Sequence, residues 1–193
     1  VSSFGAEDIP FGSPALAACA VTANKCLHGI PGLCFVLSRH SALDGAVDPP
    51  RSLTLHLPTW LEAQERQSTP FTPAVNSLLA LREALRELAR QGGWQGRHAR
   101  YGNLADQVAR ALKAAGIQPL LDTGESSCVL RAYRLPEKLD YDSVHDGLKR
   151  WGFVIYAGQG KLARVMFRIS TMGDITNYDV ERLLAAIETV FRR

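Results

Sequence analysis

The sequence predicts an α/β fold for the first part of the chain, followed by a small α+β unit. Two short apolar runs, at residues 15–21 and 33–37, are flanked by glycine and proline, which is typical of buried strands in an α/β sheet. Residues 73–92 instead repeat apolar side chains at helical spacing. Farther along, short strand-like segments alternate with helical ones, as in a small sheet covered by helices.

The segment between the two apolar runs, TANKCLHGIPG, is predicted to be a turn. It is polar, and Gly29, Pro31 and Gly32 interrupt any regular element. Leucines then alternate with polar residues over 53–57 and predict a strand, while residues 58–67 predict a short helix. The segment STPFTP, which follows, is expected to be a loop.

Two helices are expected in the middle of the chain. The first, over residues 73–92, has the most regular apolar spacing and ends at a pair of glycines. The second carries apolar residues at helical spacing from Leu104 to Ala115 and is closed by Gly116. We interpret the second as a linker helix that leads into a new domain. The chain is therefore divided into residues 1–92 and 93–193.

The C-terminal part is expected to combine strands and helices. One helix is predicted near residues 141–151, and a last one begins near Thr176, whose hydroxyl is placed to cap it. Strands are predicted at residues 118–122, 126–133, 153–157 and 163–170.

Composition excludes several classes of protein. The 193 residues are enough to bury a core, and 46% hydrophobic with 21% charged residues is ordinary for a globular protein. No apolar run is long enough to cross a membrane. The net charge of +3 comes from scattered arginines, so nucleic acid is not an expected partner.

Metal and disulfide frameworks are not expected either. The four cysteines form no CxxC pair, and the five histidines are spread singly along the chain. The sequence shows no signal peptide, so a cytoplasmic protein is the expectation. It starts without an initiator methionine, as though within a longer element, and we expect a fragment.

Lys25 is the most promising catalytic residue. The other lysines, Lys113, Lys138, Lys149 and Lys161, are expected on helix surfaces or in turns. Lys25 lies in a Gly/Pro-rich turn at a strand end, where loops of α/β sheets often place functional groups. An amine held out of water there is suited to attack a carbonyl carbon. A solvated surface charge is the alternative interpretation.

Four segments together resemble one family. VSSFG, TANKCLHGIPG, STPFTPAVNSLLALREAL and VIYAGQGKLARVMFRISTMGDI, in this order, are similar to successive motifs of the 2-aminoethylphosphonate:pyruvate transaminase family, which are class V pyridoxal-phosphate enzymes. The resemblance runs along essentially the whole chain but covers only the C-terminal half of the family's length. It implies the end of the aminotransferase large domain followed by a small α+β domain. It also implies pyridoxal 5′-phosphate as cofactor and a homodimer with the active site at the interface.

The resemblance implies specific roles for five residues. Lys25 matches the family's Schiff-base lysine, and Asn24 matches a contact of the cofactor phosphate. Thr69 and Thr72 fall in the loop that reaches the phosphate of the neighbouring subunit's cofactor, although turn-stabilising threonines are an alternative. Arg168 matches the arginine that holds the acidic group of the substrate, with a structural ion pair as the alternative.

Some family features are missing or changed. The aspartate that pairs with the pyridine nitrogen would lie upstream of Val1, as would the ring-stacking residue and the main phosphate-binding turn. His28 and the STMG run after Arg168 depart from many relatives, which leaves the amino donor open. The implied reaction moves an amino group from 2-aminoethylphosphonate to pyruvate. Alanine or serine donors with glyoxylate, and a non-catalytic dimerisation module, remain the alternatives.

Overall fold

The computed structural model describes residues 1–44 and 51–191, which form two compact units. The first unit comprises Val1–Phe4 and Ile9–Glu87, and the second comprises Gly5–Asp8 and Leu88–Arg193. None of the helices in the described ranges is both long and apolar enough to cross a membrane. All four cysteines lie in these ranges, and none of them forms a disulfide.

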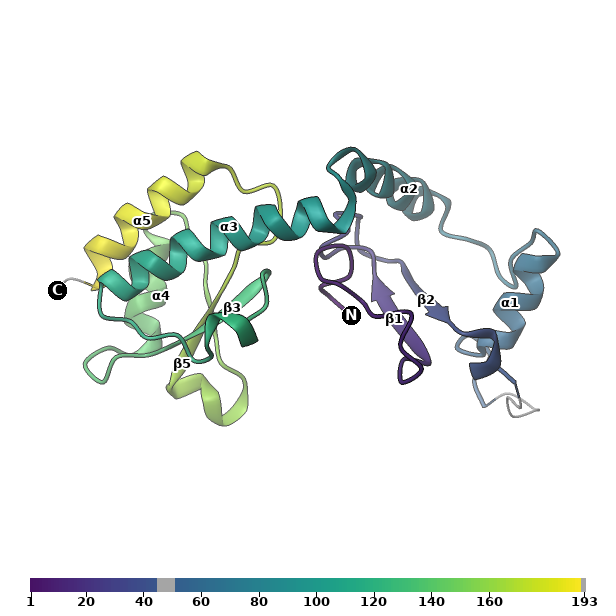
Figure 1. Cartoon of the computed structure of the whole chain (residues 1–193), viewed down its shortest axis with the longest axis horizontal. Helices are drawn as coiled ribbons and strands as arrows, with labels where there is room; N and C mark the ends of the chain where they lie inside the picture. Colours follow the sequence, from purple (N-terminus) through teal and green to yellow (C-terminus); the bar gives the residue numbers. More distant parts are fainter. Residues whose placement is uncertain (45–50, 192–193) are drawn as a thin grey trace. The chain divides into compact units, whose positions relative to one another are not determined.

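The first unit contains one antiparallel pair of strands, β1 (Ala18–Thr22) and β2 (Cys34–Ser38) (Figure 1). Both predicted strands are confirmed. The connection between them is too short for a parallel crossover, so the strands pair in opposite directions, with Val21 opposite Phe35. The expectation that both strands are buried is wrong for β2, in which no residue is fully buried.

The predicted strand over residues 53–57 is absent, and this prediction was wrong. Leu53 and Leu55 are 76% and 78% exposed, and no described strand pairs with them. Pro58 instead stands in the first turn of helix α1 (Leu57–Glu65), a position that suits its fixed φ and missing N–H. The indole N–H of Trp60 donates to the Thr54 carbonyl oxygen at 2.8 Å and holds the preceding segment against the helix.

Helix α2 (Val75–Arg90) confirms the most regular helical pattern of the sequence. The helix follows the expected loop over residues 68–74. Only Ala84 is fully buried in it, whereas Val75, Leu78, Leu79 and Leu85 are all more than 40% exposed. A short 3-10 helix, η1 (His40–Ala42), follows β2.

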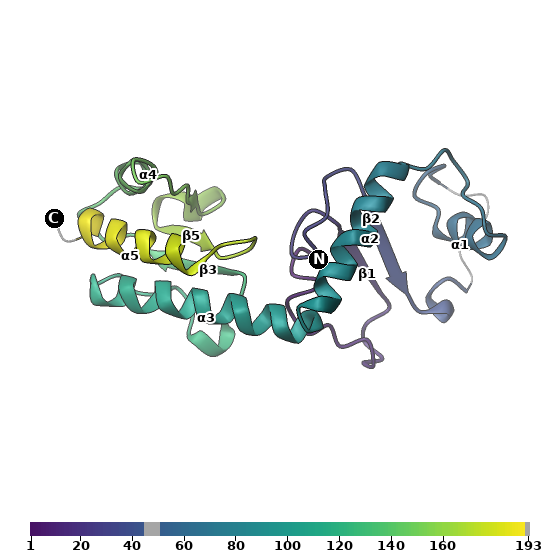
Figure 2. The same cartoon turned by 90° about the horizontal axis from the view of Figure 1, so that it is seen from above.

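The second unit is an antiparallel sheet covered by helices. Strand β5 (Met166–Ser170) is central, with β3 (Leu130–Arg134) on one side and β4 (Tyr156–Ala157) on the other. Helix α5 (Asn177–Phe191) packs beside α3 (Gly93–Ala114) and α4 (Tyr141–Lys149) (Figure 2). Short 3-10 helices, η2 (Thr123–Glu125) and η3 (Gly160–Arg164), complete the unit.

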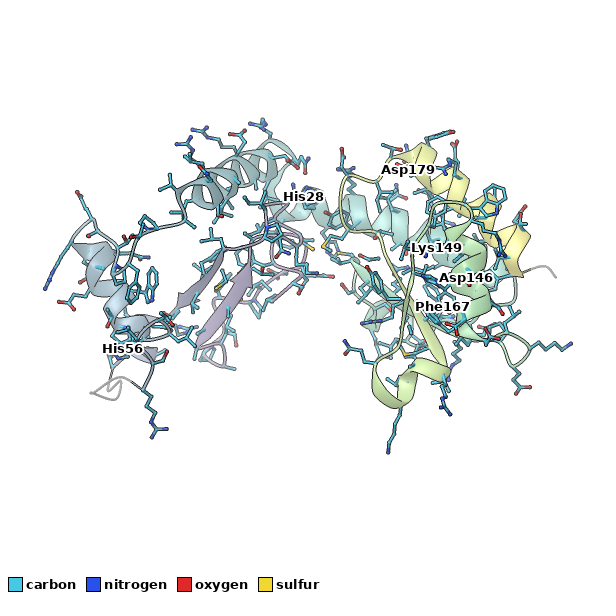
Figure 3. The ribbon with its side chains drawn as sticks, turned by 180° about the vertical axis from the view of Figure 1, so that it is seen from behind. His28, His56, Asp146, Lys149, Phe167 and Asp179 are labelled. Atoms are coloured by element: carbon cyan, nitrogen blue, oxygen red, sulfur yellow. The ribbon has the colours of Figure 1, made fainter. Side chains whose placement is uncertain are left out.

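The core of this unit is built around Phe167, which is fully buried on β5 (Figure 3). Its ring stacks on Tyr133 at 5.6 Å and on Phe191 at 5.9 Å between centroids. Burial raises the pKa of the Tyr133 phenol to about 12, so this side chain is neutral at physiological pH.

Nearby residues set the ends of three helices, and two of these signals, Gly116 and Thr176, were predicted. Gly116, with a φ of +83°, follows α3, and the Asp140 carboxylate accepts from the Ser143 N–H at 2.7 Å to cap α4. The Thr176 hydroxyl accepts from the Asp179 N–H at 3.2 Å, which confirms its predicted capping role. The Asp179 carboxylate in turn accepts from the Thr176 N–H at 2.9 Å, so the pair forms a capping box.

The predicted strand over residues 118–122 was wrong. Pro119 forms an isolated bridge to Tyr133, with flanking hydrogen bonds from the Leu120 N–H to the Ala132 carbonyl oxygen and from the Arg134 N–H to the Gln118 carbonyl oxygen, both at 2.9 Å. The strand predicted over 126–133 begins later, at Leu130.

Candidate functional site

Lys25 lies in a turn between β1 and β2 that the backbone holds in one conformation. The Gly29 N–H donates to the Ala23 carbonyl oxygen at 2.8 Å, and the His28 N–H donates to the Lys25 carbonyl oxygen at 2.9 Å. The residues that follow the lysine, Cys26 and Leu27, are fully buried. The burial of these two side chains therefore fixes the backbone that carries the Lys25 amine.

Two special conformations make this turn possible. A Cβ at Gly29 would lie 2.9 Å from the Ala23 carbonyl oxygen, so only glycine fits without movement of the backbone. His28 has a φ of +66°, which is uncommon for a residue with a side chain. Its Nδ1 lies 3.0 Å from the Glu87 carboxylate on α2, and this contact holds the histidine in place.

The Lys25 side chain is exposed, which differs from the expectation that it is held out of water. Removal of water from the Lys25 amine, which the sequence suggested, would require other residues to cover it, and the turn itself does not do so. Beside it, Asn24 is half-buried, and its side-chain oxygen accepts from the Thr22 hydroxyl at 2.5 Å. This bond orients the Asn24 carboxamide and leaves its NH₂ group to donate to a ligand.

Thr69 and Thr72 lie in the loop between α1 and α2, and both are exposed. The Thr69 hydroxyl donates to the Phe71 carbonyl oxygen at 2.8 Å, as a turn-stabilising threonine does. Within the described ranges the Thr72 hydroxyl has no hydrogen-bond partner. Thr72 is therefore the freer of the two to bind a ligand.

Arg168 stands in the middle of the central strand β5, where it is half-buried. Its Nε donates to the Ala157 carbonyl oxygen on β4 at 2.9 Å, which fixes the plane of the guanidinium near the sheet. No carboxylate of residues 1–44 or 51–191 forms an ion pair with it, so the alternative of a structural ion pair gains no support. The other guanidinium N–H groups can therefore serve a ligand.

The predicted residues divide between the two units. Asn24 and Lys25 share one turn, and Thr69 and Thr72 belong to the same unit, whereas Arg168 belongs to the second unit. The sequence motifs supplied the order of these residues along the chain, and the structure adds the backbone bonds that orient them.

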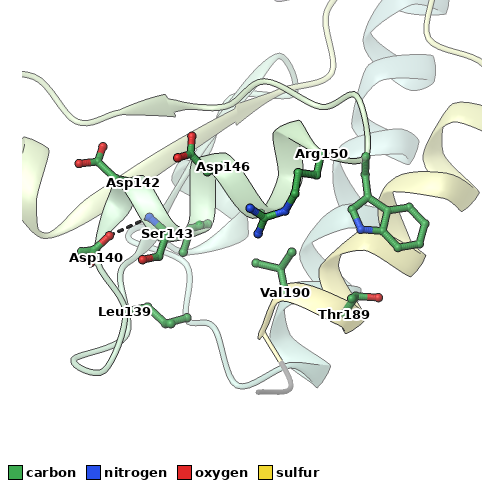
Figure 4. A pocket seen from close by; sticks show the side chains of 11 residues that line it. Leu139, Asp140, Asp142, Ser143, Asp146, Arg150, Thr189 and Val190 are labelled. Atoms are coloured by element: carbon green, nitrogen blue, oxygen red, sulfur yellow. Dashed lines mark hydrogen bonds between the residues drawn. The ribbon is translucent and has the colours of Figure 1, made fainter.

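A hollow of about 550 Å³ lies between α4 and α5, but it contains none of the predicted site residues (Figure 4). Asp140, Asp142 and Asp146 stand along its rim. These carboxylates would repel a phosphate or phosphonate group. Arg150 also lines the hollow, but with three carboxylates beside one guanidinium the hollow is a poor match for the anionic ligands that the sequence suggested.

Three other residues, for which the sequence predicted no shared role, lie close together in the fold. A carboxylate, an imidazole and a thiol of the second unit, from Glu7, His98 and Cys128, have side-chain atoms within 4.8 Å of one another. No spacing motif could have revealed them, because they come from three separate segments of the chain.

Comparison with known proteins agrees with the resemblance seen in the motifs. The chain is 34% identical over 192 residues to a 2-aminoethylphosphonate–pyruvate transaminase of Klebsiella pneumoniae, covering 97% of this chain and 52% of the relative. The corresponding protein of Aeromonas hydrophila is 36% identical over 191 residues, covering 97% of this chain and 50% of the relative. The chain thus spans about half the length of the curated relatives it matches. No protein-family model matches the chain.

Solved structures define the class of fold. An aspartate aminotransferase of Thermus thermophilus superposes with a TM-score of 0.86 at 28% identity, covering 100% of this chain and 53% of that one. A ureidoglycine–glyoxylate aminotransferase of Bacillus subtilis superposes with a TM-score of 0.81 at 29% identity, covering 92% of this chain and 47% of that one.

The fold is therefore that of part of a pyridoxal-phosphate-dependent aminotransferase. More particularly, the chain resembles class V aminotransferases over 97% of its length, and the two sequence relatives named above are 2-aminoethylphosphonate–pyruvate transaminases.

Proposed function

We propose that the protein is an aminotransferase that moves an amino group from 2-aminoethylphosphonate to pyruvate with pyridoxal 5′-phosphate. The observation that carries this proposal is the primary amine of Lys25, presented from a turn whose backbone is fixed by hydrogen bonds on both sides. The similarity to transaminases of that name over 97% of the chain supports the choice of substrates.

The residues of the turn and of the α1–α2 loop fit the proposed cofactor. Its aldehyde needs an accessible amine, and Lys25 is exposed. Its phosphate needs hydrogen-bond donors, which the Asn24 carboxamide and the Thr72 hydroxyl offer, while the Thr69 hydroxyl would first have to exchange its bond to the Phe71 carbonyl oxygen. When bound, pyridoxal phosphate supplies an electron sink for charge that develops at the substrate carbon.

In this proposal Lys25 has two tasks. Its amine binds the cofactor covalently, and once released it carries a proton between the substrate carbon and the cofactor. The anchored turn keeps the amine nitrogen close to one position during both tasks. Because Lys25 is exposed in this chain, the residues that exclude water from its amine would come from other segments or a partner subunit.

Arg168 is proposed to bind the acidic group of the substrate. A guanidinium offers a planar fork of N–H donors that matches a phosphonate or a carboxylate. The Nε bond to Ala157 uses one of the five donors and leaves the terminal nitrogens for the ligand. Residues 1–92 would then contribute to the cofactor-binding domain, and residues 93–193 would form the connecting helix and the smaller domain.

We also propose a homodimer in the cytoplasm. The loop with Thr69 and Thr72 would reach the cofactor phosphate of the neighbouring subunit. Exposed apolar side chains on α2 and β2, including Val36, Leu37 and Leu79, support a covering partner because such surface is costly to leave in water. Four cysteines without a disulfide among them agree with a reducing compartment.

A different amino donor is the second candidate. The similarity to an aminotransferase named for ureidoglycine and glyoxylate, at 29% identity, favours it. Turnover of the purified protein with 2-aminoethylphosphonate and pyruvate, compared with alanine or serine and glyoxylate, discriminates between the two. Faster turnover with the phosphonate donor is the result expected.

Trapping with borohydride tests the role of Lys25. The 193-residue chain is mixed with a slight excess of pyridoxal phosphate and reduced, and the labelled lysine is identified by peptide mass spectrometry. We expect label on Lys25 well above the level at the other four lysines, with Lys161→Arg as a matched control that leaves the result unchanged. Equal labelling of all five lysines would contradict the assignment.

A further inference from the structure

We propose that Glu7, His98 and Cys128 form a binding site for one divalent transition-metal ion, with Zn²⁺ as the expected occupant. All three belong to the second unit. Their candidate ligand atoms, a carboxylate oxygen, an imidazole nitrogen and a thiol sulfur, lie within 4.8 Å of one another. None of the three residues is among those proposed for transamination.

The distances within the cluster are close to those of a metal centre. The His98 Nδ1 lies 3.3 Å from the Glu7 Oε2. Both His98 Nδ1, at 2.8 Å, and Cys128 Sγ, at 3.4 Å, contact the carbonyl oxygen of Ala6. Tetrahedral zinc with bonds of about 2.0–2.3 Å separates its ligand atoms by about 3.3–3.8 Å. Small side-chain movements would therefore bring the three atoms to bonding distance of one ion.

The neighbouring hydrogen bonds hold the carboxylate in the required orientation. Glu7 Oε1 accepts from the Ser127 hydroxyl at 2.7 Å and from the Cys128 N–H at 2.8 Å. These two bonds leave Oε2 directed to His98. Metal-binding carboxylates are commonly fixed in this way by donors to their second oxygen. The same bonds also tie Glu7 to the segment that carries the thiol.

The types of ligand favour zinc over magnesium or calcium. Thiolate and imidazole bind borderline and soft ions, whereas Mg²⁺ and Ca²⁺ prefer oxygen ligands alone. Three protein ligands leave a fourth position for water. His98 is 46% exposed, so the ion and its water have access, while Cys128 is only 5% exposed.

Binding has a defined proton balance. The Cys128 thiol loses its proton to solvent and becomes a thiolate. The proton that His98 Nδ1 donates to the Ala6 carbonyl oxygen passes to solvent and Nε2 takes one up, so a neutral imidazole binds the ion through Nδ1. The hydrogen-bond contacts of His98 and Cys128 with the Ala6 carbonyl are then replaced by bonds to the ion. The ion would link three segments of the second unit and stabilise its folded state.

Cobalt titration of the reduced 193-residue chain tests the site. We expect one equivalent of Co²⁺ to produce a thiolate-to-cobalt charge-transfer band in the near ultraviolet, which Zn²⁺ abolishes by displacement. Cys128→Ser should remove the band. Cys34→Ser, which changes an exposed cysteine, is the matched control and should leave it intact. The proposal is overturned if the unmodified chain gives no saturable band or if Cys128→Ser retains it.

A second test, thermal unfolding with and without Zn²⁺, uses a variant that keeps the Cys128 thiol. His98→Gln changes a half-exposed side chain, so the variant should fold, and far-ultraviolet circular dichroism verifies this. We expect Zn²⁺ to raise the thermal midpoint of the unmodified chain and of Cys34→Ser, and the zinc affinity of His98→Gln to fall at least about tenfold. An equal zinc-induced rise in His98→Gln would refute the site.

Discussion

The imidazole of His28 and the carboxylate of Glu87 lie 3.0 Å apart, which joins the turn that carries Lys25 to helix α2. His28 makes this contact from a backbone conformation with a φ of +66°. Asparagine tolerates such a conformation better than a β-branched residue does. We expect His28→Asn to reduce the free energy of unfolding by about 1 kcal/mol and His28→Val by about 2–3 kcal/mol, measured by urea unfolding. Equal losses in the two variants would show that the backbone conformation is unimportant.

Gly29 is expected to be irreplaceable in the same turn. Its substitution by alanine places a Cβ 2.9 Å from a backbone oxygen, which cannot move as a flexible side chain can. We expect Gly29→Ala to destabilise the chain by about 1–3 kcal/mol and to reduce the selective labelling of Lys25 by pyridoxal phosphate. Gly12→Ala is the control, because no atom lies within 4 Å of a Cβ at that position. A neutral Gly29→Ala would contradict the packing seen in the turn.

Phe167 should be among the most sensitive positions of the second unit. It is 0% exposed and stacks between two aromatic rings. Truncation to alanine removes these contacts and leaves a cavity, so the free energy of unfolding should fall by about 3–5 kcal/mol in chemical denaturation. Leu162→Ala, at a 48% exposed position, should change it by less than about 0.5 kcal/mol. Comparable losses in the two variants would mean that Phe167 is not central to the core.

The capping box at α5 should weaken in acid. Hydrogen bonds from the Thr176 side chain and backbone lower the pKa of Asp179 below its usual 3.8. A carboxyl whose folded pKa is depressed stabilises the fold above its unfolded pKa, and that contribution is lost as the pH falls through the folded pKa. We therefore expect Asp179→Ala to lower the thermal midpoint at pH 7, with a difference from the unmodified chain that shrinks as the pH falls below 3.8 and through the folded-state pKa. Asp8→Asn, at an exposed carboxylate, is the control. A difference that does not change with pH would exclude a contribution from the charge.

Arg168 should affect substrate binding more than folding. Lysine keeps the charge but loses the planar fork, so in the proposed transaminase Arg168→Lys should raise the KM for the amino donor about tenfold or more. Arg134→Lys, on the neighbouring strand β3 and exposed, is the matched control and should leave the KM unchanged. An unchanged KM in Arg168→Lys would remove this residue from the substrate site.

Much of the fold could be predicted because the responsible interactions are local. The apolar spacing of α2 and α5, the Thr176 cap and the glycine after α3 involve residues within one or two helical turns of one another. The Lys25 turn was likewise predicted from its own glycines and proline. The roles of Lys25, Asn24, Thr69, Thr72 and Arg168 came from motif resemblance, and they remain predictions.

Tertiary structure alone decided the features that depend on distant partners. Alternating leucines at 53–57 predict a strand, yet a strand needs a neighbour to accept its backbone bonds, and none of the described strands pairs with this segment. The exposure of Lys25 depends on which segments surround the turn. The convergence of Glu7, His98 and Cys128 depends on three segments meeting in space. Chain sequence specifies local geometry directly, but long-range proximity is set by the packing of the whole unit, which short patterns do not encode.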